Sequence, residues 1–270
     1  MNPWIFLAVV VAVILLALWI PRYRLKKALA APFPEEWVQI LERNIGVYRN
    51  LPKPLRLQLR LLIKQFLFQK QFSGAGGLEV TDEMRVTIAA QACMLQLNRR
   101  GDLYPGLKYI VLYPEAFVVS RTEMDGAGVV SHGPKGLLGE SWQNGKVILA
   151  WDNVLSGARN FVDGKNVVLH EFAHQLDSQT GSTNGAPLLA GASSYRSWAA
   201  ALSPEFEELQ KDALHGKHSL MDHYGATNPA EFFAVATETF FERPRRMAEH
   251  HPELFGVLKS YYRIDPSDWQ

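Results

Sequence analysis

The sequence predicts an α+β protein: a mainly helical domain with a small mixed sheet, preceded by one N-terminal transmembrane helix. Three observations support this fold class. Residues 4–20 are uniformly apolar. Segments in the first and in the second half of the chain have apolar residues at every third or fourth position. Between them, residues 109–120 and 146–151 are rich in β-branched and aromatic side chains. This order of helices, strands and helices is typical of the α+β class.

Length and charge narrow the function classes. A chain of 270 residues can bury one sizeable core, so we expect one main domain. Its 28 Lys and Arg balance 27 Asp and Glu, and the globular part has no long basic run interleaved with aromatic residues, so nucleic acid is not an expected partner. The single cysteine, Cys93, excludes an internal disulfide and fits a reducing compartment.

The apolar run WIFLAVVVAVILLALWI at 4–20 has 17 residues and no charge. As a helix it spans about 26 Å, near the lower limit for crossing a bilayer, and a tryptophan lies near each end. The alternative is a cleaved signal peptide, because residues 28–30 are typical of a cleavage site. Four basic residues between the run and that site, with none before it, favour a single-pass anchor with a cytoplasmic body. They are Arg22, Arg24, Lys26 and Lys27.

The anchor takes residues 1–21, a basic juxtamembrane linker takes 22–33, and the globular domain takes 34–270, because the Pro-containing stretch 31–34 ends the first helix. The expected helices of the domain are 35–48, 54–72, 81–98 with Thr81 as cap, 164–179, 194–214, 228–242 and 251–263. Between the two expected strands the glycine-rich stretch indicates loops and hairpin turns. Cys93 falls among apolar residues of the third of these helices, which indicates a core position.

Residues 167–177 read VVLHEFAHQLD and contain the chemistry. On a helix, His170 and His174 project from one face a turn apart, the spacing at which two imidazoles share one metal ion. Glu171 then lies beside the metal, where a carboxylate can take a proton from a metal-activated water. The alternative is a structural role in an apolar helix. A buried unpaired charge costs several kcal/mol, so the histidines and the glutamate would then be paired with other groups in the core.

A catalytic zinc site needs a third protein ligand and an open position for water. The segment YGATNPAEFFAVATETFFE at 224–242 supplies a candidate. Asn228 suits a helix cap and Pro229 the first helical position, which puts Glu231 in the first turn of an aromatic-rich helix. Glu231 is then either a metal ligand from a second helix or the capping-box partner of Asn228.

HEFAHQLD, followed 57 residues after His174 by the glutamate of NPAEFFAVATETFF, resembles the Mlc titration factor A family of metallopeptidases. The likeness also covers VLYPEAFVV, GESWQNGKVILAWDNV and DHYGATNPAEFF, and it runs from about Pro34 to the C-terminus. The resemblance implies a zincin-like metallopeptidase domain with one zinc ion per chain, held by His170, His174 and Glu231. It implies Glu171 as the catalytic base.

The more distantly similar catalytic centre of anthrax lethal factor has a tyrosine seven residues before the ligand glutamate, which assists at the reacting carbonyl. That position is Tyr224 here. The family also implies a regulatory partner, a sugar-responsive transcription repressor. The enteric members lack an anchor, whereas this chain begins with one, so that partner is less directly implied than the activity.

Further candidates lie near these residues. Asp177 and Glu238 are on the same helix faces as the ligands, and each can accept a ring N–H of a ligand histidine or form an ordinary salt bridge. The strand at 146–151 and Trp142 precede the zinc helix, where such peptidases pair an edge strand with extended substrate; a core position is the alternative for Trp142. Among the other histidines, His132 and His223 are candidates for the substrate cleft. The remaining ones are expected at the surface: His215, His218, His250 and His251.

Together these features predict a membrane-anchored zinc peptidase, aminopeptidase-like or endopeptidase, that acts on a peptide or protein and lies in the bacterial inner membrane with its catalytic domain in the cytoplasm. One alternative is a cytoplasmic regulatory module that captures a protein partner and uses zinc structurally. Another is a deformylase-like hydrolase with a cysteine ligand, but Cys93 lies on an earlier core helix without a suitable motif.

Overall fold

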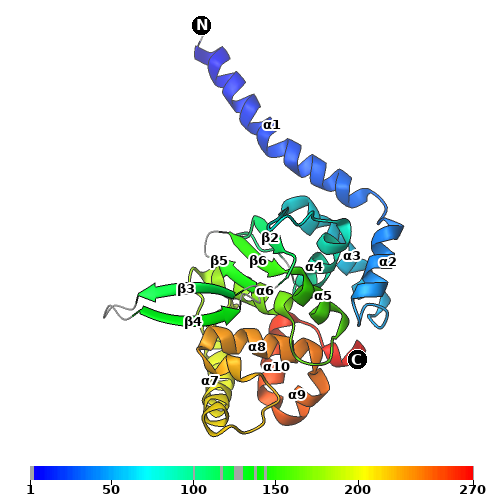
Figure 1. Cartoon of the computed structure of the whole chain (residues 1–270). Helices are drawn as coiled ribbons and strands as arrows, with labels where there is room; N and C mark the ends of the chain where they lie inside the picture. The colour runs from blue at the N-terminus through cyan, green and yellow to red at the C-terminus, as the bar shows by residue number, and fades with distance from the viewer. Residues whose placement is uncertain are drawn as a thin grey trace.

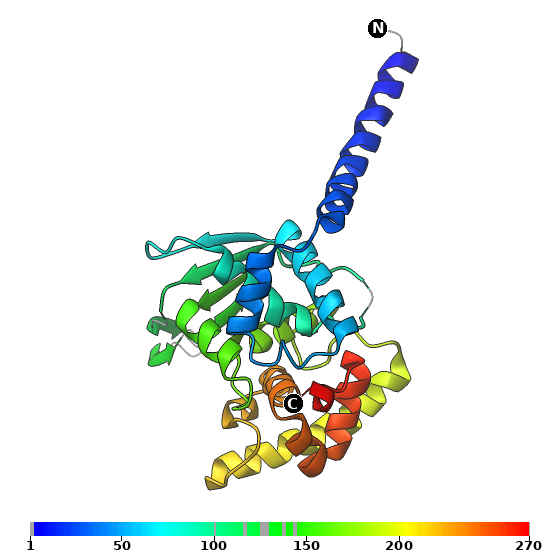
Figure 2. The ribbon, with the colours of Figure 1, turned by 90° about the vertical axis from the view of Figure 1, so that its right-hand side faces the viewer.

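The computed structural model describes residues 3–99, 101–115, 118–124, 130–136, 139–142 and 145–269, with the backbone alone described in the third, fourth and fifth of these ranges. The predicted fold class is confirmed, because the chain is mostly helical with a small sheet and one long apolar N-terminal helix. In both views that helix leads away from the rest of the molecule, and the C-terminal half lies at the far end (Figures 1 and 2).

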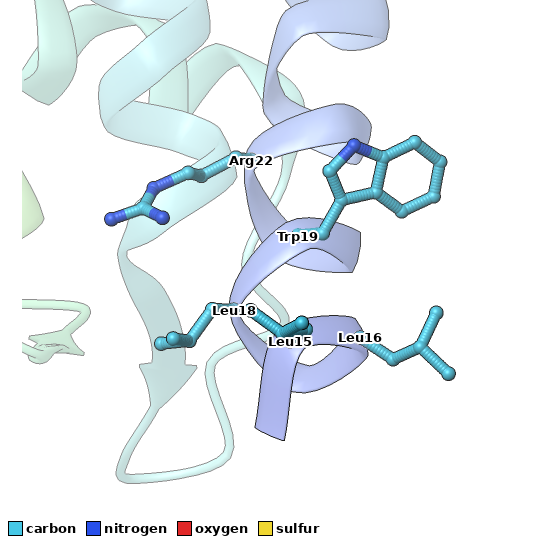
Figure 3. Close-up of a pocket in the computed structure, with 5 residues that line it drawn as sticks. All are labelled: Leu15, Leu16, Leu18, Trp19 and Arg22. Carbon is cyan, nitrogen blue, oxygen red and sulfur yellow. The ribbon is translucent and has the colours of Figure 1, made fainter. Parts of the chain in front are cut away.

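Helix α1 (Pro3–Ala30) has no buried residue. Among the described residues it is the one helix long and apolar enough to cross a membrane, a property that a signal sequence shares. Near the end of its apolar part, Trp19 stacks on Tyr23 with ring centroids 4.9 Å apart. Figure 3 shows the change in character along the helix, where Leu15, Leu16 and Leu18 give way to Trp19 and then to Arg22.

The first helices of the body are α2 (Glu35–Asn44), α3 (Lys53–Gln69) and α4 (Asp82–Met94). The predicted cap of α4 is confirmed, because the Thr81 hydroxyl accepts a hydrogen bond from Met84 N at 3.3 Å. Cys93 is completely buried in α4, as predicted, and burial raises the pKa of its thiol.

The helix predicted at 54–72 ends too late. It stops at Gln69, and Gln71–Gly74 form strand β1 instead, because Gln71 N donates to Lys108 O at 2.9 Å and the segment pairs with a neighbouring strand. In the sequence, Phe72 continues the helical spacing of apolar residues in α3. In the structure it lies in β1 and packs against Phe66 of α3, with ring centroids 6.3 Å apart.

The main sheet has the order β1-β2-β6-β5. Strands β1, β2 (Tyr109–Tyr113) and β6 (Lys146–Ala150) are parallel, with Gln71 opposite Tyr109 and Ile110 opposite Val147. Strand β5 (Gly139–Trp142) runs antiparallel to β6 and forms one edge of the sheet. The sheet is therefore small and mixed, as the sequence predicts.

Two strand predictions need correction at their ends. The run at 109–120 is not one strand, because β2 ends before Pro114, which lacks the N–H that a ladder needs. Among the described residues, β3 (Val118–Met124) pairs with β4 (Val130–Gly136) alone, in antiparallel orientation. The run at 146–151 ends at Ala150, because Trp151 begins an unpredicted helix, α5 (Trp151–Arg159).

The second half of the chain is helical. Its α-helices are α6 (Val167–Asp177), α7 (Ala192–His215), α8 (Pro229–Glu242), α9 (Pro244–His250) and α10 (Pro252–Tyr262), with short 3-10 helices at Ser178–Thr180, His223–Ala226 (η2) and Pro266–Trp269. Four of the five α-helices follow the predicted segments, and α9 was not predicted.

Helix α6 lies inside the body, with one side packed in the apolar core and the other side directed to α8. Phe172 is completely buried, with its ring 4.8 Å from that of Tyr104 and 5.7 Å from that of Phe66. This apolar side fixes α6 against the N-terminal half of the domain. The opposite side, which carries His170 and His174, faces α8.

Candidate metal centre

Asn166 starts the helix that carries the two histidines. Its side-chain oxygen accepts hydrogen bonds from Val168 N and Leu169 N at 3.1 and 3.0 Å, which satisfies two of the free N–H groups at a helix start. From this fixed start, His170 and His174 fall on one face of α6, four residues apart. Their ring centroids are 4.8 Å apart, so helix geometry brings the two imidazoles together as the sequence predicts.

Asn228 starts α8 in the same way, with its side-chain oxygen accepting from Ala230 N and Glu231 N at 3.0 Å each. Pro229 occupies the first turn, as expected. The side chain of Glu231 reaches the histidines of α6, with Oε2 3.0 Å from His170 Nε2 and 3.3 Å from His174 Nε2. Asn228 therefore caps the helix while the Glu231 carboxylate is directed to the metal centre.

The donor atoms of His170, His174 and Glu231 all lie within 4.8 Å of one another. The two Nε2 atoms are 3.2 Å apart, and the three side chains are between 11% and 18% exposed. Two imidazole nitrogens and one carboxylate oxygen converging at a partly open point form a donor set that binds zinc and similar divalent ions, and one face stays accessible.

The charges of the site favour a cation. Burial by itself lowers the pKa of His170, but hydrogen bonds with Glu231 and Glu238 raise it to about 10. Burial by itself raises the pKa of Glu231, yet hydrogen bonds from His170 and His174 lower it to about 2. The carboxylates thus stabilise positive charge at the point where the donor atoms meet, so the residues fit a bound divalent metal.

Glu171 follows the first histidine on α6 and is 4% exposed. It lies close enough to Tyr224 to raise the pKa of that phenol. The carboxylate is therefore held within the site and out of bulk water, although it is not one of the three converging donors.

Tyr224 lies on η2, with its ring tilted by 38° to that of His170 and the centroids 5.9 Å apart. Burial of part of the side chain, the nearby charges of Glu231 and Glu171, and a hydrogen bond with Glu231 raise the pKa of the Tyr224 hydroxyl to about 12. The phenol therefore stays protonated at neutral pH and can donate. The residue is still 56% exposed, so it stands at the mouth of the site.

Glu238, seven residues after Glu231 on α8, lies behind His170. Its Oε1 accepts from His170 Nδ1 at 2.7 Å, and its Oε2 accepts from the backbone N–H of Asn166. Of the two uses weighed from the sequence, Glu238 therefore makes the bond to the ring of a ligand histidine.

Sequence reasoning missed the role of Asn166 and Glu242 in this arrangement. Glu242 accepts from Gly164 N at 2.8 Å and from Asn166 Nδ2 at 3.1 Å, and burial raises the pKa of Glu242 to about 8. Two signals were available: Asn166 directly precedes the apolar helix, and Glu242 follows Glu238 by one helical turn. The carboxylates of α8 thereby fix the start of α6.

Asp222 was also missed. Its Oδ1 accepts from Tyr224 N at 2.9 Å, and its Oδ2 pairs with Lys165 Nζ at 3.1 Å. Asp222 thus ties the short helix that carries Tyr224 to the loop before α6.

The hydrogen bond of Asp177 is made to a backbone N–H rather than to a histidine ring. Its Oδ2 accepts from Gly185 N at 2.7 Å, and burial raises the pKa of this carboxyl. Within the described part of the chain, its Oδ1 and the Nδ1 atom of His174 have no hydrogen-bond partner. The observed bond differs from both roles weighed for Asp177, a bond to a histidine ring and a salt bridge: it fixes the loop after α6, and that loop packs against Pro229 through Gly185.

The other predicted histidines are not brought into the centre. His223 is exposed beside Tyr224, and His215, His218 and His250 are exposed as expected. His251 is an exception, because it is half-buried and pairs with Glu205. The backbone of His132 lies in β4, opposite Thr122, rather than in a loop; its side chain and that of Trp142 lie outside the described residues.

An HExxH helix, a glutamate from a second helix and a carboxylate held beside them define the metal site of the HExxH class of metallopeptidases. The chain belongs to the glucose-regulated metallo-peptidase M90 family, whose sequence profile matches residues 19–263. The resemblance found in the sequence is confirmed.

Curated relatives agree with this assignment. The chain is 40% identical over 245 residues to an uncharacterized protein of Synechocystis sp.. The aligned residues cover 90% of this chain and 89% of the relative. It is 34% identical to the Mlc titration factor A of Serratia proteamaculans, over 80% of this chain and 83% of the relative. The Mlc titration factor A of Yersinia pestis is 30% identical, over 86% and 85%.

Proposed function

We propose that this chain is a zinc-dependent peptidase that hydrolyses peptide bonds with Glu171 as general base. The observation that carries the proposal is the convergence of His170, His174 and Glu231 from two helices within 4.8 Å. Three protein donors converge among the residues that the structure describes, rather than the four of a structural zinc site, and this supports a position left for water and substrate.

In this proposal His170, His174 and Glu231 would hold one zinc ion per chain through the donor atoms that converge in the structure. When bound, zinc supplies Lewis-acid chemistry, which polarises the scissile carbonyl and acidifies water. Glu238 orients His170 and makes it a better donor. Asp177 acts more remotely, by holding the loop that packs against the start of α8.

Glu171 takes the proton of the attacking water and delivers it to the leaving amine. Its burial supports this role, because a carboxylate shielded from bulk water keeps its proton transfer within the site. Tyr224 donates its hydroxyl hydrogen to the oxyanion that forms at the carbonyl. The raised pKa of that hydroxyl supports the role of donor.

The expected substrate strand at 146–151 corresponds to β6, which lies between β2 and β5 in the sheet, so the edge strand β5 is the candidate substrate platform instead. It pairs with β6 on one side, ends the sheet on the other, and contacts α6. An extended peptide can add to such an edge through main-chain hydrogen bonds and so lie across the metal centre. The family description names a metallo-peptidase and does not mention aminopeptidase activity, so the aminopeptidase expectation is not supported.

The decisive experiment compares wild type with Glu171→Gln. The variant should retain zinc, measured by elemental analysis, and lose at least about 100-fold in cleavage of a peptide library. Glu231→Gln is the matched variant and should lose the metal as well. Full activity in Glu171→Gln contradicts the role of Glu171, and absence of zinc from gently purified wild type contradicts the proposal as a whole.

We further propose that residues 1–21 anchor the chain in a bacterial inner membrane, that 22–33 form a juxtamembrane linker and that the peptidase domain, 34–270, lies in the cytoplasm. The apolar, exposed α1 and the four basic residues after its apolar part support this topology. Helix α1 continues through most of the linker to Ala30.

A second candidate function is capture of a regulatory protein, such as a transcription repressor. The relatives named Mlc titration factor A favour it, because that name describes titration of Mlc. Comparing partner capture by wild type and Glu171→Gln separates the two: capture that is equal in both variants, without any cleavage by wild type, supports the regulatory module.

A further inference from the structure

Positive charge is concentrated on two helices. Helix α1 and helix α3 each contain four basic residues and no acidic residue, whereas the rest of the chain has 20 Lys and Arg against 27 Asp and Glu. The chain, whose net charge is +1, therefore has a strongly basic part, formed by the end of α1 and by α3, and an acidic remainder. Such an asymmetry indicates a negatively charged partner for the basic part.

Helix α3 also has an apolar outer face. Leu57 and Leu61 are 52% exposed and Phe68 is 42% exposed. Leu61 and Phe68 follow Leu57 by four and eleven residues, so the three side chains lie within about 40° of one another around the helix axis. Single exposed apolar residues are ordinary, but three aligned on one helix face form a continuous apolar surface.

This face lies at the base of α1. Leu25, Ala28 and Leu29 are the half-buried positions after the apolar run, at the spacing of one helix face. Lys64, which lies between Leu61 and Phe68 on α3, donates from Nζ to Leu29 O at 2.7 Å and also to Ala31 O. Helices α1 and α3 are thus fixed to each other at this point (Figure 1).

The spacing along α1 puts α3 near the bilayer surface. Five residues separate Ile20, the last residue of the apolar run, from Leu25, which is about 8 Å of helix. The polar headgroup region on one side of a bilayer is about 5–8 Å thick. The body therefore begins where the headgroups end, and the tilt common for single spans brings the side of the body closer still.

We propose that this α3 docking face, formed by Leu57, Leu61 and Phe68 with the exposed Lys53 of α3 and the basic residues of α1, binds the anionic lipid surface next to the anchor. The proposal rests on the membrane topology proposed above. Exposed leucine and phenylalanine enter the headgroup boundary, while lysine and arginine pair with anionic headgroups. A second copy of the chain is disfavoured as occupant, because a symmetric contact places like charges against each other.

The chain offers a clean way to test this. Its single native cysteine is completely buried, so a cysteine introduced at the surface is labelled selectively. Three single variants of the full chain carry an environment-sensitive fluorophore: Leu61→Cys on the docking face, Leu15→Cys in the anchor, and Leu214→Cys on α7. Leu214 is 83% exposed and lies in the last turn of α7, a helix at the end of the body away from α1 (Figure 1), so it is the matched control.

The labelled proteins are reconstituted in vesicles of phosphatidylcholine with or without phosphatidylglycerol, using brominated lipids as quenchers. The label at 61 should be quenched at least about twofold more than the label at 214 in anionic vesicles, and salt should reduce the difference. Phe68→Cys should behave as Leu61→Cys, which guards against a local effect of one substitution.

Each remaining outcome contradicts a specific claim. Quenching at 15 with no more quenching at 61 than at 214 overturns the docking face and leaves the anchor intact. No quenching at 15 overturns the membrane topology. Shielding of the label at 61 that depends on protein concentration, and is equal without phosphatidylglycerol, overturns lipid binding in favour of self-association.

Discussion

The Nδ1 atom of His170 lies 2.7 Å from Oε1 of Glu238, so α8 holds a metal-site histidine of α6 from its second ring nitrogen. The other oxygen of Glu238 accepts from the backbone of Asn166, which caps the same helix. One carboxylate therefore sets both the orientation of the imidazole and the position of the helix that carries it. Glu231, on the same face of α8, approaches the same ring from the opposite nitrogen.

The first prediction follows for Glu238→Gln. The amide keeps the size of the side chain but removes the charge that makes His170 a strong donor, so metal affinity should fall about 10- to 100-fold. Competition with a chromogenic chelator measures this. The exposed Glu249→Gln on α9 is the control and should bind metal as wild type does. An unchanged affinity in Glu238→Gln shows that the bond to His170 does not tune the site.

The second prediction concerns Tyr224→Phe. If the hydroxyl stabilises charge only as the reaction proceeds, its removal should lower kcat about 100- to 1,000-fold and leave KM and metal content nearly unchanged. The neighbouring His223 is exposed, so His223→Ala serves as the control and should keep wild-type kinetics. A loss that falls on KM alone assigns Tyr224 to substrate binding instead.

The third prediction tests the start of α6. Asn166→Ala removes the two capping bonds to Val168 N and Leu169 N, along with the side-chain bonds to Gly157 O and Glu242. The free energy of unfolding should fall by about 2 kcal/mol, at the upper end for loss of a helix cap, because these groups are buried. Urea denaturation of the full chain in detergent measures it. Thr81→Ala, which removes a single 3.3 Å bond, should cost less.

Helix periodicity alone was enough to place His170, Glu171 and His174, because residues on one helix have fixed relative positions. Glu231 was different: the sequence allowed a capping box as well as a ligand, and only the packing of α8 on α6 directs its carboxylate to the histidines. The resemblance to a known family supplied what local patterns left open.

The contacts around the site depend on tertiary packing that no local pattern contains. Glu238 and Glu242 reach Asn166 across more than 70 residues of sequence. Strand β1 exists because Gln71–Gly74 meet β2, and its first two residues, Gln71 and Phe72, continue the helical pattern of α3 in the sequence. Asp177 had the right spacing for a histidine partner, but its Oδ2 accepts a hydrogen bond from the backbone of Gly185 in the following loop.

His251, expected at the surface, instead connects two helices. It precedes α10, and its Nδ1 lies 2.7 Å from Oε2 of Glu205 on α7, with both side chains less than 20% exposed. The hydrogen bond to Glu205 is the main cause that raises the pKa of His251 above its usual value. The folded state therefore binds a proton on this histidine more tightly than the unfolded state does.

The fourth prediction is the resulting pH dependence of stability. Because the folded pKa is raised, the stabilisation is fully present below the unfolded pKa of about 6.5 and disappears as the pH rises through the folded value. Glu205→Gln should thus cost about 1.5–3 kcal/mol at pH 5.5 and less at pH 9. Urea denaturation at both pH values measures the difference, with the exposed Glu207→Gln on the same helix as the control. An equal cost at both pH values means that the pair stabilises the fold by packing rather than by charge.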